Sequence, residues 1–146
     1  MNYLICPVSS DRIPEAVPRL TALLVILTLM LYVISGALFL LVFLLCDFLI
    51  RGYGNSRYSL LARLSGFVIK QLGVTSALID KAPKVFAARL GVVFVLLILM
   101  SHIWSADLVG IGLSAGLILF AMAECVLNFC VGCYVYVLVV LPLQNK

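Results

Sequence analysis

Charged residues are scarce in this chain and absent from long stretches of it. Only 11% of its 146 residues are Asp, Glu, Lys or Arg, whereas 65% are hydrophobic, and the mean hydropathy is +1.26. Soluble domains are about half apolar and about a quarter charged. The length leaves room for one compact bundle and for no separate soluble catalytic domain. The sequence therefore predicts an all-α integral membrane protein with a single domain, residues 1–146.

Motifs of several soluble enzyme classes are also missing. The sequence has no glycine-rich phosphate loop, no HExxH and no GxSxG motif, and His102 is its only histidine. Its net charge of +4 comes from the segments between apolar tracts, where basic residues set topology and attract anionic lipid. Membrane lipid is therefore an expected partner, and nucleic acid is not.

The basic residues are distributed on one side of the apolar tracts. All ten Lys and Arg residues lie outside residues 21–50 and 90–145. Because cytoplasmic loops of membrane proteins carry an excess of Lys and Arg, this asymmetry places the N-terminus and the ends of both tracts on the cytoplasmic side. Residues 1–19 lack the pattern of a cleavable signal peptide, so we expect the first span to act as the targeting signal.

The apolar tracts predict four transmembrane helices arranged as two hairpins. Residues 17–50 are too long for one span and suit two short ones with a turn at Ser35-Gly36. Residues 85–127 form the second expected hairpin, with an external turn over residues 101–107. Residues 1–16 are then an N-terminal cytoplasmic segment.

The tract after the second turn is too long for a single span. From Leu108 to Leu143, one helix would extend about 54 Å, whereas the bilayer core is about 30 Å thick. We therefore expect a break at Asn128 and Gly132. Residues 128–146 then contain a short C-terminal half-helix.

The segment between the hairpins, residues 51–84, has a different character. Within it, residues 59–72 place apolar side chains at helical spacing, and Arg63 and Lys70 mark a polar side. This pattern predicts an amphipathic helix lying on the inner leaflet.

The two hairpins resemble distant copies of each other. Arg19-Leu20 opens the first and Arg89-Leu90 the second, while Asp47 and Glu124 close them. A parallel repeat about an axis along the membrane normal would bring Arg19 near Asp47 and Arg89 near Glu124. An acid at the end of a span is costly unless paired, so we expect two structural ion pairs, with a proton relay through Glu124 as the alternative.

The strongest chemical motif is a Cys-x-x-Cys element formed by Cys130 and Cys133. This spacing allows a disulfide or supplies two thiolates to a soft metal ion. If the helix breaks at Asn128, both thiols start the terminal segment, where the helix dipole favours the thiolate. On the reducing side of the membrane such a pair is more typical of redox, metal or sulfur chemistry than of a structural disulfide.

The other cysteines have different expected roles. Cys6 could fold back over the cytoplasmic mouth, resolve a disulfide of Cys130 or Cys133, or complete a three-thiolate metal site. Cys46 and Cys125 are expected to be packing residues. No organic cofactor is expected.

The chain resembles a bacterial membrane family known as domain of unknown function 4395. The resemblance lies in the N-terminal CPVS, in RYSLLARL, in DKAPKVFAARLGVVF and in FCVGCY, and it spans nearly the whole sequence. It implies a bacterial inner-membrane protein that is a companion of thioredoxin-like and sulfurtransferase proteins. Thiol or sulfur traffic is the function that this resemblance suggests.

Three functional hypotheses follow. The first is thiol-disulfide exchange or sulfur relay by Cys130 and Cys133, which would make the protein a thiol-disulfide oxidoreductase in the case of exchange. The second is transport of a sulfur oxyanion or soft metal ion between the hairpins, with a homodimer supplying further helices. The third is a structural or metal-binding subunit that uses Cys6, Cys130 and Cys133.

Overall fold

The computed structural model describes residues 12–54, 58–75, 77–80, 82–127 and 134–144 of the chain. These residues form six α-helices, one π-helical segment and two short strands. In chain order they are β1 (Arg12–Pro14), α1 (Ala16–Ser35), α2 (Leu38–Tyr53), α3 (Leu60–Leu72), β2 (Leu78–Asp80), α4 (Ala82–Ile103), α5 (Asp107–Leu127), η2 (Tyr136–Val140) and α7 (Leu141–Gln144).

The first hairpin turns at the position that the sequence indicates. Helix α1 ends at Ser35, and Gly36 follows in the left-handed conformation with φ +66°, which a residue without a Cβ adopts at little cost. Its N–H donates to the Tyr32 carbonyl and closes the helix at 2.7 Å. Ala37 is extended, so the chain reverses and α2 begins at Leu38.

The second hairpin also follows the expected pattern. Helix α4 ends at Ile103, and α5 begins at Asp107, whose negative charge suits the positive end of the helix dipole. Helix α5 ends at Leu127, just before the break expected at Asn128 and Gly132. Those two residues themselves lie outside the described part of the chain.

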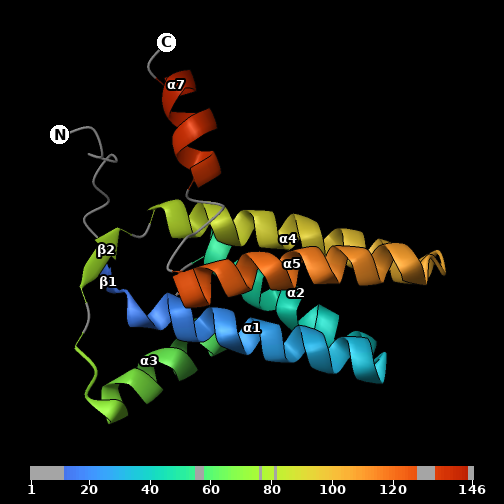
Figure 1. The fold of residues 1–146 in the computed structure, drawn as a ribbon, viewed down its shortest axis with the longest axis horizontal. Helices are drawn as coiled ribbons and strands as arrows, with labels where there is room; N and C mark the ends of the chain where they lie inside the picture. Colours follow the sequence, from blue (N-terminus) through green and yellow to red (C-terminus); the bar gives the residue numbers. More distant parts are fainter. Residues whose placement is uncertain (1–11, 55–57, 76, 81, 128–133, 145–146) are drawn as a thin grey trace.

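The four long helices lie side by side in a bundle (Figure 1). Helix α1 contacts α5, and α2 contacts α4, more extensively than α1 contacts α2 or α4 contacts α5. The first helix of each hairpin therefore packs against the second helix of the other. The core contains a set of almost fully buried apolar side chains: Val25, Leu29, Leu41, Leu44, Val95 and Ile98.

Helix α3 crosses one end of this bundle and splits its apolar side chains between two surfaces. Leu61 and Ile69 are buried, and the buried Ser65 accepts a hydrogen bond from Thr21 of α1 at 2.9 Å. Leu64 and Phe67 are exposed on the outside of the helix. One face of α3 thus fixes it to α1, and the other is free to enter the lipid of one leaflet.

A small antiparallel ladder was not expected from the sequence. Arg12 pairs with Asp80 in register, and Pro14 pairs with Leu78. The N–H of Glu15 extends the ladder by donating to the Ala77 carbonyl at 2.9 Å. The segment before α1 is therefore joined to the segment before α4.

Three of the helices are long and apolar enough to cross a membrane. They are α1, residues 84–103 of α4 and residues 107–126 of α5. Helix α2 has 16 residues, which corresponds to about 24 Å at 1.5 Å per residue, and its last turns carry Asp47 and Arg51. A multi-pass membrane protein agrees with these lengths.

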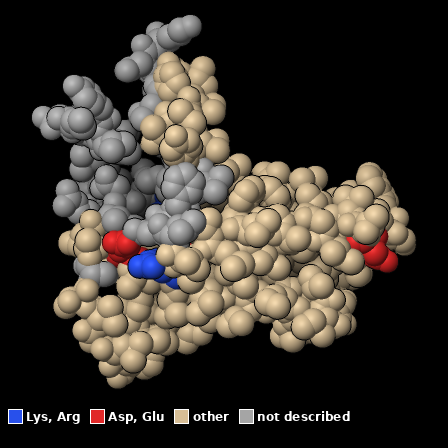
Figure 2. Space-filling model, viewed as in Figure 1, with Lys and Arg blue, Asp and Glu red and all other residues tan. Residues whose placement is uncertain are grey.

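Charge is distributed unevenly between the two ends of the bundle. On the face drawn in Figure 2, Lys and Arg atoms lie only near the end that carries α3, whereas the charged atoms visible at the opposite end all belong to Asp or Glu. We call the end near α3 the basic end. The turns at Ser35-Gly36 and at residues 104–106 lie at the other end and contain no Lys or Arg.

Some glycines of α5 lie at its contact with α4, and one lies on the surface of the bundle. A Cβ added to Gly110 would lie 3.6 Å from Ser101, and one added to Gly116 would lie 3.9 Å from Phe94, so both face α4. Gly112 has no such neighbour within 4 Å. Gly110 and Gly116 therefore allow α5 to pack closely on α4.

Gly91 provides a test of the close contact between α2 and α4. A Cβ at this position would lie 2.6 Å from Phe48 Cε1, and Phe48 is buried. We expect Gly91→Ala to destabilise the protein by about 1–3 kcal/mol, as overpacking does. Thermal unfolding of the purified protein in detergent measures this as a lower melting temperature.

Gly112→Ala is the matched control, because nothing lies within 4 Å of its added Cβ. Alanine has the higher helix propensity by about 1 kcal/mol, so this variant should be at least as stable as the wild type. Equal behaviour of the two variants would show that the Gly91 contact is not tight.

Candidate functional site

The basic end of the bundle is organised around the buried carboxylate of Asp47 in α2. Asp47 is 3% exposed. Its Oδ1 accepts hydrogen bonds from the Ser59 hydroxyl and from the Leu61 N–H, the latter at 3.3 Å. Ser59 is the N-cap of α3 and also accepts from the Ala62 N–H. One carboxylate therefore fixes the N-terminus of α3, where negative charge is favoured by the helix dipole.

Arg51 lies one helical turn after Asp47 and supplies its counter-charge. Arg51 Nε lies 2.9 Å from Asp47 Oδ2. At this distance the two opposite charges form an ion pair within one face of α2. The guanidinium lies over the Phe48 ring, with 4.7 Å between Cζ and the ring centroid. Its Nη2 is buried and has no hydrogen-bond partner in the part of the chain that the structure describes.

The predicted pairing of Asp47 with Arg19 is wrong. Arg19 instead donates from Nε to the Cys125 carbonyl at 3.1 Å. Arg51 is a closer partner because residues i and i+4 of a helix lie on one face. That i,i+4 spacing is visible in the sequence and was the signal that could have identified Arg51.

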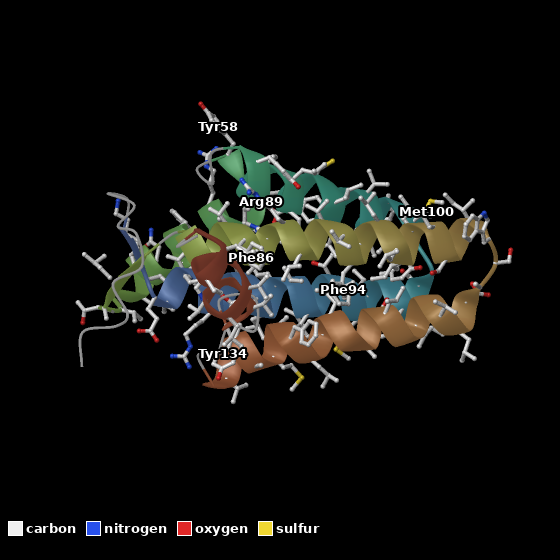
Figure 3. All side chains as sticks on the ribbon, turned by 90° about the horizontal axis from the view of Figure 1, so that it is seen from above. Tyr58, Phe86, Arg89, Phe94, Met100 and Tyr134 are labelled. Atoms are coloured by element: carbon white, nitrogen blue, oxygen red, sulfur yellow. The ribbon has the colours of Figure 1, made fainter. Side chains whose placement is uncertain are left out.

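The predicted pairing of Glu124 with Arg89 is also wrong. Glu124 forms its ion pair with Lys84, at the start of α4. Arg89 donates from Nε to the Gly52 carbonyl at 2.9 Å, and its guanidinium lies 5.0 Å from the Tyr53 ring centroid. Figure 3 shows Arg89 on the side of α4 that faces α2.

Arg19 and Arg89 occupy matching places in the two hairpins. Each lies in the first helix of its hairpin and donates to a carbonyl in the last turns of the other hairpin's second helix, Cys125 in one case and Gly52 in the other. The last carbonyls of a helix lack partners within the helix and carry partial negative charge. These carbonyls, and not the carboxylates, are the partners of both arginines.

A cavity of about 110 Å³ lies between the four long helices near this polar cluster. Arg51 and Glu124 are its charged lining residues. Phe94, which Figure 3 shows reaching from α4 towards α5, meets Phe120 edge-on with 5.6 Å between ring centroids. The remaining walls are apolar as well and include Ala22, Val25, Leu90, Phe94, Leu117 and Ala121.

The cysteines that the sequence singles out are described only in part. Cys6, Cys130 and Cys133 lie outside the described residues. Cys46 and Cys125 are both free thiols; Cys125 is half-buried, whereas Cys46 is exposed on α2 and is not a core residue. Within the described ranges, no group of three or more His, Cys, Asp or Glu side chains could hold a metal ion.

Comparison with known families identifies the chain. The model of a family described as "Domain of unknown function (DUF4395)" matches residues 13–140. The chain belongs to this family. The match covers every described element from α1 to η2, including the Asp47 and Arg51 cluster, and it confirms the resemblance noted in the sequence. Neither the curated proteins nor the solved structures provide a match to the DUF4395 chain.

The Asp47–Arg51 pair predicts an asymmetry between two double variants. Asp47→Ala leaves the buried guanidinium of Arg51 without its counter-charge and should destabilise the protein by about 3–5 kcal/mol. Asp47→Ala with Arg51→Ala should recover part of that loss, since no charge is then left buried and unpaired. Thermal unfolding and the yield of folded protein in the membrane measure both effects.

Asp47→Ala with Arg19→Ala is the matched control. Arg19 bonds to the Cys125 carbonyl and not to Asp47, so this double variant should lose the sum of the two single effects. Recovery with Arg19→Ala and none with Arg51→Ala would contradict the pairing seen in the structure.

Proposed function

We propose that the chain is a multi-pass protein of the bacterial inner membrane with four transmembrane helices and its basic end in the cytoplasm. The start of α1 contacts α3 through the hydrogen bond from Thr21 to Ser65. The end of α2 contacts α3 through Asp47, which accepts a hydrogen bond from the Leu61 N–H. Helix α2 must therefore return the chain to the side from which α1 starts. Together with the three longer helices, α2 then makes a fourth span, shorter than the others and polar in its last turns.

The matching contacts of Arg19 and Arg89 support two hairpins related by a parallel repeat. In this repeat the pair Arg51-Gly52 corresponds to Glu124-Cys125, because Gly52 and Cys125 accept the equivalent hydrogen bonds. Asp47 then lies about one helical turn deeper than Glu124. The basic end faces the cytoplasm according to the positive-inside bias.

The function that we propose is thiol-disulfide exchange or sulfur relay by Cys130 and Cys133. The observation that carries this proposal is the position of the last described turns of α5. Helix α5 ends at Leu127 at the basic end, with its last turns held by the bond from Arg19 to Cys125, and the Cys-x-x-Cys element follows three residues later in the sequence. Positive charge near a thiol favours the thiolate, which is the nucleophilic form.

The proposed exchange proceeds in two steps. A thiolate of the pair attacks a disulfide of a thioredoxin-like partner, forming a mixed disulfide and releasing one partner thiolate. The second cysteine then attacks the mixed disulfide, which forms the Cys130–Cys133 disulfide and releases the partner as a dithiol. The membrane protein loses two electrons and the partner gains them. With a persulfide of a sulfurtransferase, the same attack at the outer sulfur transfers one sulfur atom.

The orientation predicts how the cysteines react in intact cells. A membrane-impermeant maleimide applied from outside should leave Cys130 and Cys133 unmodified, and both should react once the membrane is permeabilised. Ser35→Cys, an exposed position at the opposite end of the bundle, is the positive control for labelling from outside. Modification is read by mass spectrometry of peptides, and equal labelling of Cys130 before and after permeabilisation would reverse the orientation.

The exchange mechanism predicts that one single-cysteine variant accumulates a mixed disulfide. If Cys130 is the attacking thiol, Cys133→Ser should trap a thioredoxin-like protein, and Cys130→Ser should not; the reverse result assigns the attack to Cys133. Cys46→Ser is the control, since Cys46 faces out of the bundle. Mass-shift alkylation after purification without reductant gives the oxidation state. A pair that stays reduced under mild oxidant while zinc or copper copurifies would replace exchange with metal binding.

A further inference from the structure

The cavity at the basic end has features of a ligand site that do not involve the proposed thiol chemistry. We propose that it binds a small carboxylate with an apolar tail, whose charged group is held by Arg51. The cavity lies between both hairpins, with walls from α1, α2, α4 and α5. Three features favour such a ligand: an unused donor on Arg51, an excess of positive charge at this end of the bundle, and apolar walls.

The unused donor is Nη2 of Arg51. Asp47 contacts the guanidinium through Nε at 2.9 Å, and Phe48 covers one face of it at 4.7 Å. Nη2 remains buried with no acceptor among the described residues, although Arg51 lines the cavity. Buried donors are nearly always satisfied in folded proteins, and leaving one unpaired is costly. A ligand oxygen in the cavity would supply the missing acceptor.

The charge at this end favours an anion over a neutral ligand. Within α1, α2, α4 and α5 the basic end carries four cations, Arg19, Arg51, Lys84 and Arg89, against two carboxylates, Asp47 and Glu124. Two positive charges are therefore in excess. Glu124 also lines the cavity and opposes negative charge there, and because this repulsion grows with the charge of the ligand, a monoanion held at Arg51 fits better than a dianion.

The apolar walls of the cavity determine which part of a ligand can accompany its carboxylate. Apart from Arg51 and Glu124, the lining residues that the structure describes are apolar, so a strongly hydrated ion such as sulfate would lose its water without replacement. A cavity of about 150 Å³ holds benzene, and about 110 Å³ here suits a ligand of a few heavy atoms. A carboxylate with a short alkyl tail places its oxygens on Arg51 and its carbons against the walls.

Equilibrium dialysis of the full chain in detergent with radiolabelled butyrate tests the proposal. We expect saturable binding of about one butyrate per chain that excess unlabelled butyrate displaces and that chloride or sulfate at equal ionic strength does not. Competition by decanoate distinguishes the source of the carboxylate: displacement indicates that an acyl chain from the bilayer can also enter, and no displacement indicates a free short acid. Binding that chloride or sulfate abolishes equally would overturn the proposal.

Two variants locate the site. Ala121→Leu fills the cavity from α5, and Arg51→Lys keeps the charge but removes the forked nitrogen; each should weaken butyrate binding at least tenfold. Ala115→Leu is the matched control, the same change on an exposed position of α5, and should bind like the wild type. Either variant decides the test if the other does not fold. Unchanged affinity in a folded Ala121→Leu or Arg51→Lys protein would show that butyrate binds elsewhere.

The site does not depend on the proposed thiol chemistry. A Cys130→Ser, Cys133→Ser double variant should keep its affinity for butyrate, because the proposed contacts are made by Arg51 and by the apolar walls of the cavity. Loss of exchange with retained binding would separate the two proposals. Loss of binding in this variant, with the fold intact, would count against the cavity as the site.

Discussion

The arrangement of the basic end depends on a carboxylate that has been taken out of water. Asp47 is almost fully buried in α2, and three groups compensate its charge: the hydroxyl of Ser59, the N–H of Leu61 and the guanidinium of Arg51. A buried ion without such partners would destabilise the fold by several kcal/mol. Because two of the three partners belong to the start of α3, the charge can only be compensated when α3 lies across the end of the bundle. The position of α3 then brings Ser65 to Thr21 of α1.

The two halves of the bundle are connected by arginines that bond to backbone carbonyls. Arg19 and Arg89 each reach from one hairpin to the C-terminal turns of the other. Each of these bonds satisfies both of its partners. The last carbonyls of a helix need donors, and a cation near a membrane span needs negative partial charge. It also leaves the carboxylates to other cations. Arg51 is then the partner of Asp47, and the cavity that Arg51 shares with Glu124 lies beside this pair.

Hydropathy and charge distribution were sufficient to predict the helical elements. The left-handed Gly36 and the amphipathic α3 both follow from patterns that local chemistry determines. The ion-pair partners could not be predicted, because pairing depends on the relative depth of helices, and an error of one turn exchanges Arg51 for Arg19. The cavity likewise depends on how four helices pack. The proposed thiol site lies in residues 128–133, outside the described chain, so its chemistry stays a prediction.

The ladder between β1 and β2 has a consequence for the order of assembly. It joins residues 12–14 to residues 78–80, so the first hairpin and α3 are enclosed in a loop of chain that is complete before α4 is synthesised. Domains generally fold as units from the N-terminus during synthesis. The first half can therefore close on itself in the membrane and present α1 and α2 as a finished surface. The second hairpin can then pack α4 on α2 and α5 on α1 as it inserts, because those two helices are already in place.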